Sequence, residues 1–198
     1  MGSEPDDING KTPLDEDEKE GLLIKSITTR SELDEFEQQN IEKAMLWLKK
    51  KKLSPKEILS EKFVRDLHRR MYADIWKWAG EFRRTDKNIG IDKHQITVAL
   101  KQLLDDGLYW MEHHRFPDEE IAIRLKHRMV QIHCFANGNG RHSRLMADII
   151  MEKVFHLPLF TWGAANLVKH GDLRRAYLKA LKKADAGDYT DLLTFARS

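Results

Sequence analysis

A twelve-residue stretch in the second half of the chain carries the side chains best suited to chemistry. Residues 133–144 read HCFANGNGRHSR, which places a histidine, a Gly-Asn-Gly turn and two arginines close together. A glycine-rich turn that opens a helix leaves the first main-chain N–H groups without partners, and these groups favour an anion. Arg141 and Arg144 stand in the first turn of that helix, where guanidinium groups suit phosphate oxygens. His133 precedes the turn and titrates near neutrality, so the pattern indicates phosphoryl or nucleotidyl transfer.

Helices are predicted on both sides of this stretch. Apolar residues recur at positions 121, 125, 129 and 132 before it, and residues 144–155 after it are apolar on one side, as in amphipathic helices. The glycines also have a purely structural interpretation, because such turns often do no more than end one helix and start the next. A P-loop is excluded, since no lysine followed by Ser or Thr ends the turn.

The same stretch resembles the signature of the Fic (Doc-related) family, H-x-F-x-[DE]-G-N-G-R-x-x-R. The matching residues are His133, Phe135, Gly138, Asn139, Gly140, Arg141 and Arg144. Residues 78–83, WAGEFR, are similar to the family's W-A-G-x-[YF]-R segment, and the whole pattern most resembles the subgroup known as mobile mystery protein B. The resemblance implies an all-α, Fic-like helical bundle and an enzyme that transfers AMP from ATP to a Ser, Thr or Tyr hydroxyl of a target protein.

The resemblance also assigns roles to individual residues. His133 is expected to be the general base, although a histidine at a helix C-terminus also has a purely structural reason to be there, facing the negative end of the dipole. The groups expected to bind the phosphates of ATP are the main-chain N–H groups of Gly138, Asn139 and Gly140 and the side chains of Arg141 and Arg144. Phe135 is assigned to the core, as is the thiol of Cys134.

Asn137 departs from the family pattern. It stands where most Fic AMP-transferases have the Asp or Glu that holds Mg²⁺. An amide oxygen brings no negative charge, so we expect weak metal binding at Asn137, with Mg²⁺ held mainly by the nucleotide. Two alternatives to AMP transfer therefore stay open: a transferase that uses another phosphorylated donor, and a nucleotide-binding module with weakened chemistry.

Many Fic proteins are inhibited by a helix with the motif [ST]-x-x-x-E-[GN], whose glutamate pairs with the second motif arginine. The chain holds two incomplete matches. Glu20 and the following glycine fit the end of the motif, but Glu16 stands where Ser or Thr is expected. Ser31 to Glu35 fit its beginning, but Phe36 follows. We favour Glu20 as the inhibitory residue, and expect removal of residues 1–25 to raise nucleotide transfer.

Composition indicates one globular, cytoplasmic domain with an acidic arm. The 198 residues are 41% hydrophobic and 33% charged, with no apolar run long enough for a membrane, no secretory signal and a single cysteine. Residues 1–25 read as a mostly irregular arm and residues 26–198 as the helical domain. Residues 1–20 hold eight acids and two bases, which leaves 32 bases against 24 acids in the remainder. The basic remainder alone does not argue for nucleic acid, and no spacing of histidines indicates a zinc site.

About eight helices are predicted. Ser31 is the expected N-cap of a helix to about Lys51, and its inner side is formed by Leu33, Phe36, Ile41, Ala44, Met45 and Leu48. Ser54-Pro55 starts the next helix, with Leu59, Phe63, Leu67, Met71 and Ile75 on its inner side. Further helices are expected at about 97–113, 117–133, 140–155, 163–184 and 188–197.

The helical pattern breaks between residues 81 and 97. Isoleucines there alternate with charged and turn-forming residues, which predicts a small β-hairpin flap. The family resemblance implies that this flap docks the target protein by adding a strand from its main chain. A simple surface loop is the alternative.

Overall fold

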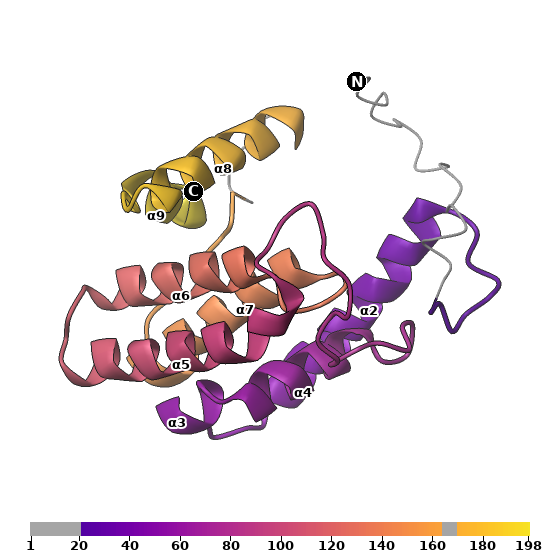
Figure 1. Ribbon diagram of the computed structural model, residues 1–198, viewed down its shortest axis with the longest axis horizontal. Coiled ribbons are helices and arrows are strands. Elements are labelled where there is room, and N and C mark those ends of the chain that lie inside the picture. Colours follow the sequence, from indigo (N-terminus) through magenta and orange to yellow (C-terminus); the bar gives the residue numbers. More distant parts are fainter. Residues whose placement is uncertain (1–20, 164–169) are drawn as a thin grey trace. The chain divides into compact units, whose positions relative to one another are not determined.

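The computed structural model describes residues 21–163 and 170–198, and this part of the chain is almost entirely helical (Figure 1). Its α-helices are α2 (Arg30–Lys49), α3 (Pro55–Ile58), α4 (Glu61–Tyr72), α5 (Ile96–Glu112), α6 (Asp118–Ile132), α7 (Asn139–Ile150), α8 (His170–Asp185) and α9 (Thr190–Arg197). A short 3-10 helix, η1 (Lys93–Gln95), leads into α5, and a π-helical turn, η2 (Met151–Phe155), continues α7. The all-α prediction is therefore confirmed.

Two compact units divide the described residues. One holds residues 21–51 and 65–81, and the other holds residues 52–64 together with everything described from residue 82 onward. Helix α4 contributes its first turn to the second unit and the rest to the first. No helix in the described part of the chain combines the length and the apolar character that crossing a bilayer requires.

In the first unit, α2 begins two residues earlier than predicted. Thr29 is the N-cap: its hydroxyl accepts from the Glu32 N–H at 3.3 Å, and the Glu32 carboxylate accepts from the Thr29 N–H at 3.1 Å. This reciprocal capping box needs Glu or Gln three residues after the cap, which Thr29 has in Glu32, whereas Ser31 is followed at that spacing by the shorter Asp34. The predicted N-cap Ser31 is therefore wrong.

The inner side of α2 differs from the prediction at two positions. Leu33, Ala44 and Leu48 are buried as expected, whereas Phe36 and Met45 are exposed. Glu37 is buried in their place, because its carboxylate accepts a 2.6 Å hydrogen bond from the indole of Trp76. A satisfied carboxylate thus occupies part of the interior that the apolar pattern assigned to Phe36. Other buried side chains of this unit are Ile27, Leu67, Met71, Tyr72 and Ile75.

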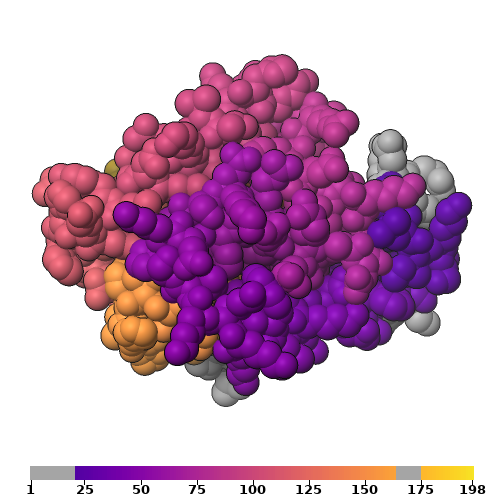
Figure 2. Space-filling model, turned by 90° about the horizontal axis from the view of Figure 1, so that it is seen from below, coloured from indigo at the N-terminus to yellow at the C-terminus, as the bar shows by residue number. Residues whose placement is uncertain are grey.

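The helix predicted from Ser54 starts as expected but is interrupted. Ser54 caps α3 in a capping box with Glu57, and Pro55 occupies the first turn. The hydroxyl of Ser60 then donates to the carbonyl of Glu57 and accepts from the N–H of Phe63 at 3.2 Å. This serine ends one helix and starts the next, so α3 and α4 are separate. Figure 2 shows the outer side of this segment at the surface, in purple.

In the second unit, α6 packs against both α5 and α7, and α8 packs against α9 (Figure 1). The close approach of α5 and α6 depends on Gly107, where a Cβ atom would stand 2.7 Å from a methyl group of Leu125. Buried apolar residues on these helices are Leu100, Leu103, Leu104, Ile121, Leu125, Met129, Met146, Ile149 and Ile150. The packed helices α5, α6 and α7 thus support the α6–α7 junction, which carries the motif.

The β-hairpin predicted for residues 81–97 is absent. The segment consists of turns and bends followed by η1, and its one β-bridge joins Phe82 to Phe135. The carbonyls within the segment are bound by the guanidinium of Arg83, which donates to Thr85 at 2.9 Å and to Ile91. A side chain thus replaces the cross-strand hydrogen bonds, and the alternative of a surface loop is the correct one.

Candidate active site

The motif lies in the loop that joins α6 to α7, and one asparagine closes this loop. The side chain of Asn139 accepts from the N–H of Phe135 at 2.9 Å and donates to the carbonyl of the same residue at 2.8 Å. Asn139 is only 5% exposed, so these two hydrogen bonds are shielded from water. The side chain of Asn139 therefore fixes the loop, a role that the sequence did not indicate.

The N-terminus of α7 is open to an anion. Gly138 is the N-cap, in a left-handed conformation with φ 75°, and no side chain caps the helix. The first turn holds no acid and does hold Arg141. A Cβ atom on Gly140 would meet nothing within 4 Å, so glycine is not required there by the packing of the protein itself. Space for a ligand therefore exists beside the positive end of α7.

His133 ends α6 with φ 55° and ψ 60°, a left-handed conformation that is uncommon for a residue with a side chain. The residue is half-buried, and its Nδ1 is buried with no hydrogen-bond partner in residues 21–163 and 170–198. Burial lowers the pKa of His133, and the charges of Arg83 and Lys87 lower it further, whereas the carbonyl of Val130 opposes them. The imidazole is thus neutral at pH 7 and available as a base.

The 82–91 segment holds His133 in place. Arg83, which is 5% exposed, donates from Nε to the His133 carbonyl at 2.7 Å, and its main-chain N–H donates to the Cys134 carbonyl at 2.9 Å. Gly90 (φ 100°) approaches so closely that a Cβ atom would stand 2.6 Å from the Cβ of His133. Sequence reasoning missed both residues, and the only signal for Arg83 was its place at the end of the WAGEFR segment.

The two motif arginines stand on successive turns of α7, and both are half-buried. Arg144 makes no hydrogen bond or ion pair that involves the described residues, which leaves its guanidinium available to a ligand. Near it lies Lys126, a fully buried lysine of α6 whose Nζ donates to the hydroxyl of Tyr177. Burial, followed by the charge of Arg144, lowers the pKa of Lys126 to about 7.

Residues 58–151 match the model of the Fic/DOC family, and this range contains the whole loop, α6 and α7. The similarity to this family model thus covers the centre of the chain. "Protein adenylyltransferase Fic" of Aedes aegypti is 23% identical over 159 residues, which cover 78% of this chain and 30% of the mosquito protein. The protein of the same name from Drosophila grimshawi is 26% identical over 68% of this chain and 27% of its own. The chain therefore spans less than a third of the length of either relative.

Solved Fic structures share the fold. A fragment of Fic-1 from C. elegans superposes with a TM-score of 0.68 and 22% identity, covering 90% of this chain and 51% of that fragment. The N-terminal FIC domain of Bep8 from Bartonella sp. 1-1C also gives 0.68, with 16% identity over 87% of this chain and 88% of that domain. BepC from Bartonella tribocorum, solved with bound AMPPNP, gives 0.65 with 15% identity over 90% of this chain and 95% of its own.

At the motif, Asn137 does not fit a metal held by the protein. Asn137 is exposed, and its side-chain oxygen accepts a 2.7 Å hydrogen bond from the N–H of Gly138. The oxygen carries no charge, and no group of three His, Cys, Asp or Glu side chains suited to a metal occurs in the described parts of the chain. The same hydrogen bond occupies the N–H of Gly138, which the sequence assigned to phosphate binding.

Two further predictions concern Cys134 and the N-terminal arm. Burial raises the pKa of the Cys134 thiol to about 12, so this cysteine packs and is no nucleophile at neutral pH. Glu20, the proposed inhibitory residue, lies outside the described residues. The end of the predicted arm is described from Gly21, and Leu22 in it is buried and paired with Trp76.

Proposed function

We propose that this chain is a protein adenylyltransferase that moves AMP from ATP to a Ser, Thr or Tyr hydroxyl of a target protein. The observation that carries the proposal is the uncapped N-terminus of α7, with Arg141 and Arg144 on its first turns and the neutral imidazole of His133 on the preceding loop. The two relatives named protein adenylyltransferase Fic support the reaction, and the AMPPNP bound by BepC supports the nucleotide.

The reaction needs a base and fixed positive groups. The hydroxyl oxygen attacks the α-phosphorus, its proton moves to His133, and the bond to the β-phosphate breaks, so that pyrophosphate leaves. Since Nδ1 of His133 is buried, Nε2 is the nitrogen that receives the proton. The charge that develops on the phosphates is stabilised by the N–H groups at the start of α7, by Arg141 and by Arg144, which takes the γ-phosphate.

Asn137 supports a second candidate, transfer of a different phosphorylated group. Without a carboxylate at this position, no charged side chain of the motif attracts the Mg²⁺ that accompanies ATP. Mg²⁺ then depends on the phosphates for its binding, and a donor with a different number of phosphates becomes a substrate. This candidate uses the same open N-terminus of α7 and the same His133.

Labelled nucleotides separate these functions. The chain is incubated with cell lysate and with ATP labelled at either the α- or the γ-phosphate. Label from the α-phosphate on protein, lost in His133→Ala, is the expected result. Label from the γ-phosphate indicates phosphate transfer instead, and binding of ATP without either label indicates a binding module. Label that persists in His133→Ala removes the assignment of the base.

The target is proposed to dock on residues 81–97, and the protein is proposed to act in the cytoplasm. The docking proposal is supported by Ile89, which is 61% exposed on the segment that contacts His133. The single, buried Cys134 supports a reducing compartment.

A further inference from the structure

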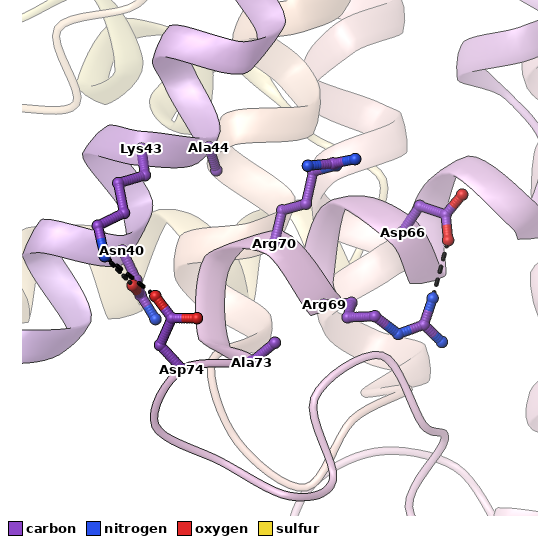
Figure 3. Close-up of a pocket in the computed structure, with 8 residues that line it drawn as sticks. All are labelled: Asn40, Lys43, Ala44, Asp66, Arg69, Arg70, Ala73 and Asp74. Atoms are coloured by element: carbon purple, nitrogen blue, oxygen red, sulfur yellow. Dashed lines mark hydrogen bonds and ion pairs between the residues drawn. The ribbon is translucent and has the colours of Figure 1, made fainter. Parts of the chain in front are cut away.

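A polar groove lies in the first unit, between α2 and the second half of α4, away from the motif in the sequence. It has a volume of about 440 Å³. Ala44 and Ala73 supply small side chains to its walls, and polar or charged side chains supply the rest (Figure 3). A cleft of this size is within the range that small ligands and short peptide segments occupy.

One wall of the groove holds a buried donor with no acceptor. Asn40 is 3% exposed, and its Nδ2 has no hydrogen-bond partner in the part of the chain that the structure describes. Its Oδ1 is already used, because it accepts from Nζ of Lys43 at 3.5 Å. Buried amide groups are nearly always paired in native proteins, so this N–H donor indicates a ligand that supplies an oxygen.

The charges that line the groove leave one cation without a carboxylate. Lys43 pairs with Asp74 at 3.0 Å, and Arg69 pairs with Asp66 at 3.0 Å (Figure 3). The guanidinium of Arg70 lies 4.1 Å from the centre of the Trp47 ring and has no ion pair with any described residue. The groove therefore offers one unused donor and one net positive charge, which together suit a carboxylate.

An acidic run of the chain is close in sequence to a segment that is bound to residues near this groove. The carbonyl of Gly21 accepts from the N–H of Lys77 at 2.9 Å, and the N–H of Leu23 donates to the carbonyl of Ile75 at 2.8 Å. Lys77 is three residues beyond Asp74, which lines the groove. The run Asp15-Glu16-Asp17-Glu18 precedes Gly21 by three to six residues, a span of at most about 10–20 Å.

We propose that the groove between α2 and α4 is a carboxylate-binding site whose occupant is the run 15–18 of the same chain. One carboxylate of the run accepts from Nδ2 of Asn40, and Arg70 supplies the compensating charge. The run brings four acids and no base, so its charge is opposite to that of the groove. The site is independent of the proposed nucleotide chemistry and of the role assigned to Glu20.

Amide NMR spectra of the full-length chain test the occupant. We compare the unchanged chain with D15N/E16Q/D17N/E18Q, and with D6N/D7N as a control that removes charge elsewhere in the arm. The expected result is a shift of the Asn40 side-chain amide and of the Ala44 and Ala73 main-chain amides in the first variant only. Identical spectra around the groove in all three chains would overturn the proposal. Asn40→Leu identifies the side-chain signal, and its loss confirms the assignment.

Proteolysis of the full chain provides a second measurement. A protease specific for glutamate cuts after Glu16 and Glu18, and bound segments are cut more slowly than free ones. We expect Arg70→Gln to raise this cleavage rate about two- to fivefold, the size expected of an exposed charge pair. Arg115→Gln, at an exposed arginine in the other unit, is the matched control. Equal rates in the two variants contradict the proposal.

An external carboxylate is distinguished from the arm by titration. Sodium succinate is added to the unchanged chain and to D15N/E16Q/D17N/E18Q. If the arm occupies the groove, succinate shifts the Asn40 amide signal at lower concentration in the variant, because no competitor remains. If succinate binds both chains equally, the groove belongs to a free carboxylate and the assignment of the arm is wrong.

Discussion

Nε of Arg83 donates a 2.7 Å hydrogen bond to the main-chain carbonyl of His133. The carbonyl belongs to a residue in the left-handed conformation, which costs a residue with a side chain about 1–2 kcal/mol. The hydrogen bond from Arg83 offsets this cost. The planar guanidinium is held in place for this contact because it also donates to the carbonyls of Thr85 and Ile91. One buried side chain thus links the segment expected to dock the target to the base expected to activate it.

Replacement of Arg83 by Met should reduce both stability and transfer. Three carbonyls lose a charged donor, so we expect the free energy of unfolding to fall by about 2–4 kcal/mol. Because His133 also loses its support, the rate of AMP transfer should fall at least about tenfold at a temperature where the variant is folded. Urea denaturation and α-labelled ATP measure the two effects. Arg115→Met, at an exposed position of the same unit, should change neither, and equal behaviour of the two variants would refute the role of Arg83.

The pKa of His133 predicts the acid limb of the transfer rate. Burial holds this pKa below 6.5, so the imidazole remains neutral, and able to accept a proton, at pH values somewhat below 6.5. The rate should therefore fall only when the pH passes below 6.5, with a midpoint at the lowered pKa of the free enzyme. A profile of kcat/KM against pH measures this midpoint. A limb centred above 6.5 would show that another group controls the reaction.

Local signals in the sequence predicted most of the helices. The apolar spacing was sufficient to predict α6 and α7, because the same residues are buried against neighbouring helices. Ser54-Pro55 was sufficient to predict the start of α3, because its capping box is local in sequence. The start of α2 was misplaced because two candidates for the cap, Thr29 and Ser31, lie two residues apart. What distinguishes them is the residue three positions later, which is Glu32 for Thr29 and the shorter Asp34 for Ser31.

The contacts that support the site could not be predicted in the same way. Arg83 and His133 are fifty residues apart in sequence, and no periodicity links a side chain to a distant main-chain carbonyl. The hairpin prediction failed for this reason: Arg83 takes the carbonyls that a second strand would have taken. The side-chain role of Asn139 is hidden for a different reason, because asparagine beside glycine is typical of any turn. From the sequence, only the main-chain N–H of Asn139 was therefore given a role, in phosphate binding.

Lys126 should make the protein less stable at neutral pH than it would be with an apolar residue. Burial lowers its pKa from 10.5 to about 7, so the cost of burying this lysine is full below pH 7 and disappears as the pH approaches 10.5. We expect Lys126→Met to raise the free energy of unfolding by about 1–4 kcal/mol at pH 7. The gain should shrink as the pH rises. Denaturation at pH 7 and pH 10 checks this, and a loss of stability in Lys126→Met at pH 7 would contradict it.

Glu20 is predicted to restrain the transferase by pairing with Arg144. Deletion of residues 1–25 is a poor test of this prediction. It would also remove Leu22, which is buried and paired with Trp76 in the first unit. Glu20→Gly avoids this problem. Its rate of AMP transfer should rise at least about fivefold, the effect of removing an ion pair at the γ-phosphate position. Glu4→Gly, outside both the motif and the run 15–18, is the control. An unchanged rate in Glu20→Gly would exclude this glutamate as the inhibitor.

Asn137→Asp tests whether the missing carboxylate limits the use of Mg²⁺. A carboxylate at this position adds the charged oxygen ligand that Mg²⁺ prefers, so half-maximal transfer should need about tenfold less Mg²⁺ than in the unchanged chain. The substitution also changes the partner of the Gly138 N–H, but a carboxylate accepts that hydrogen bond as well. Asn137→Gln keeps an uncharged amide and is the control for shape. If Asn137→Asp gains no affinity for Mg²⁺, while a donor other than ATP labels the target faster than ATP does, the chain uses that donor and the assignment of AMP transfer fails.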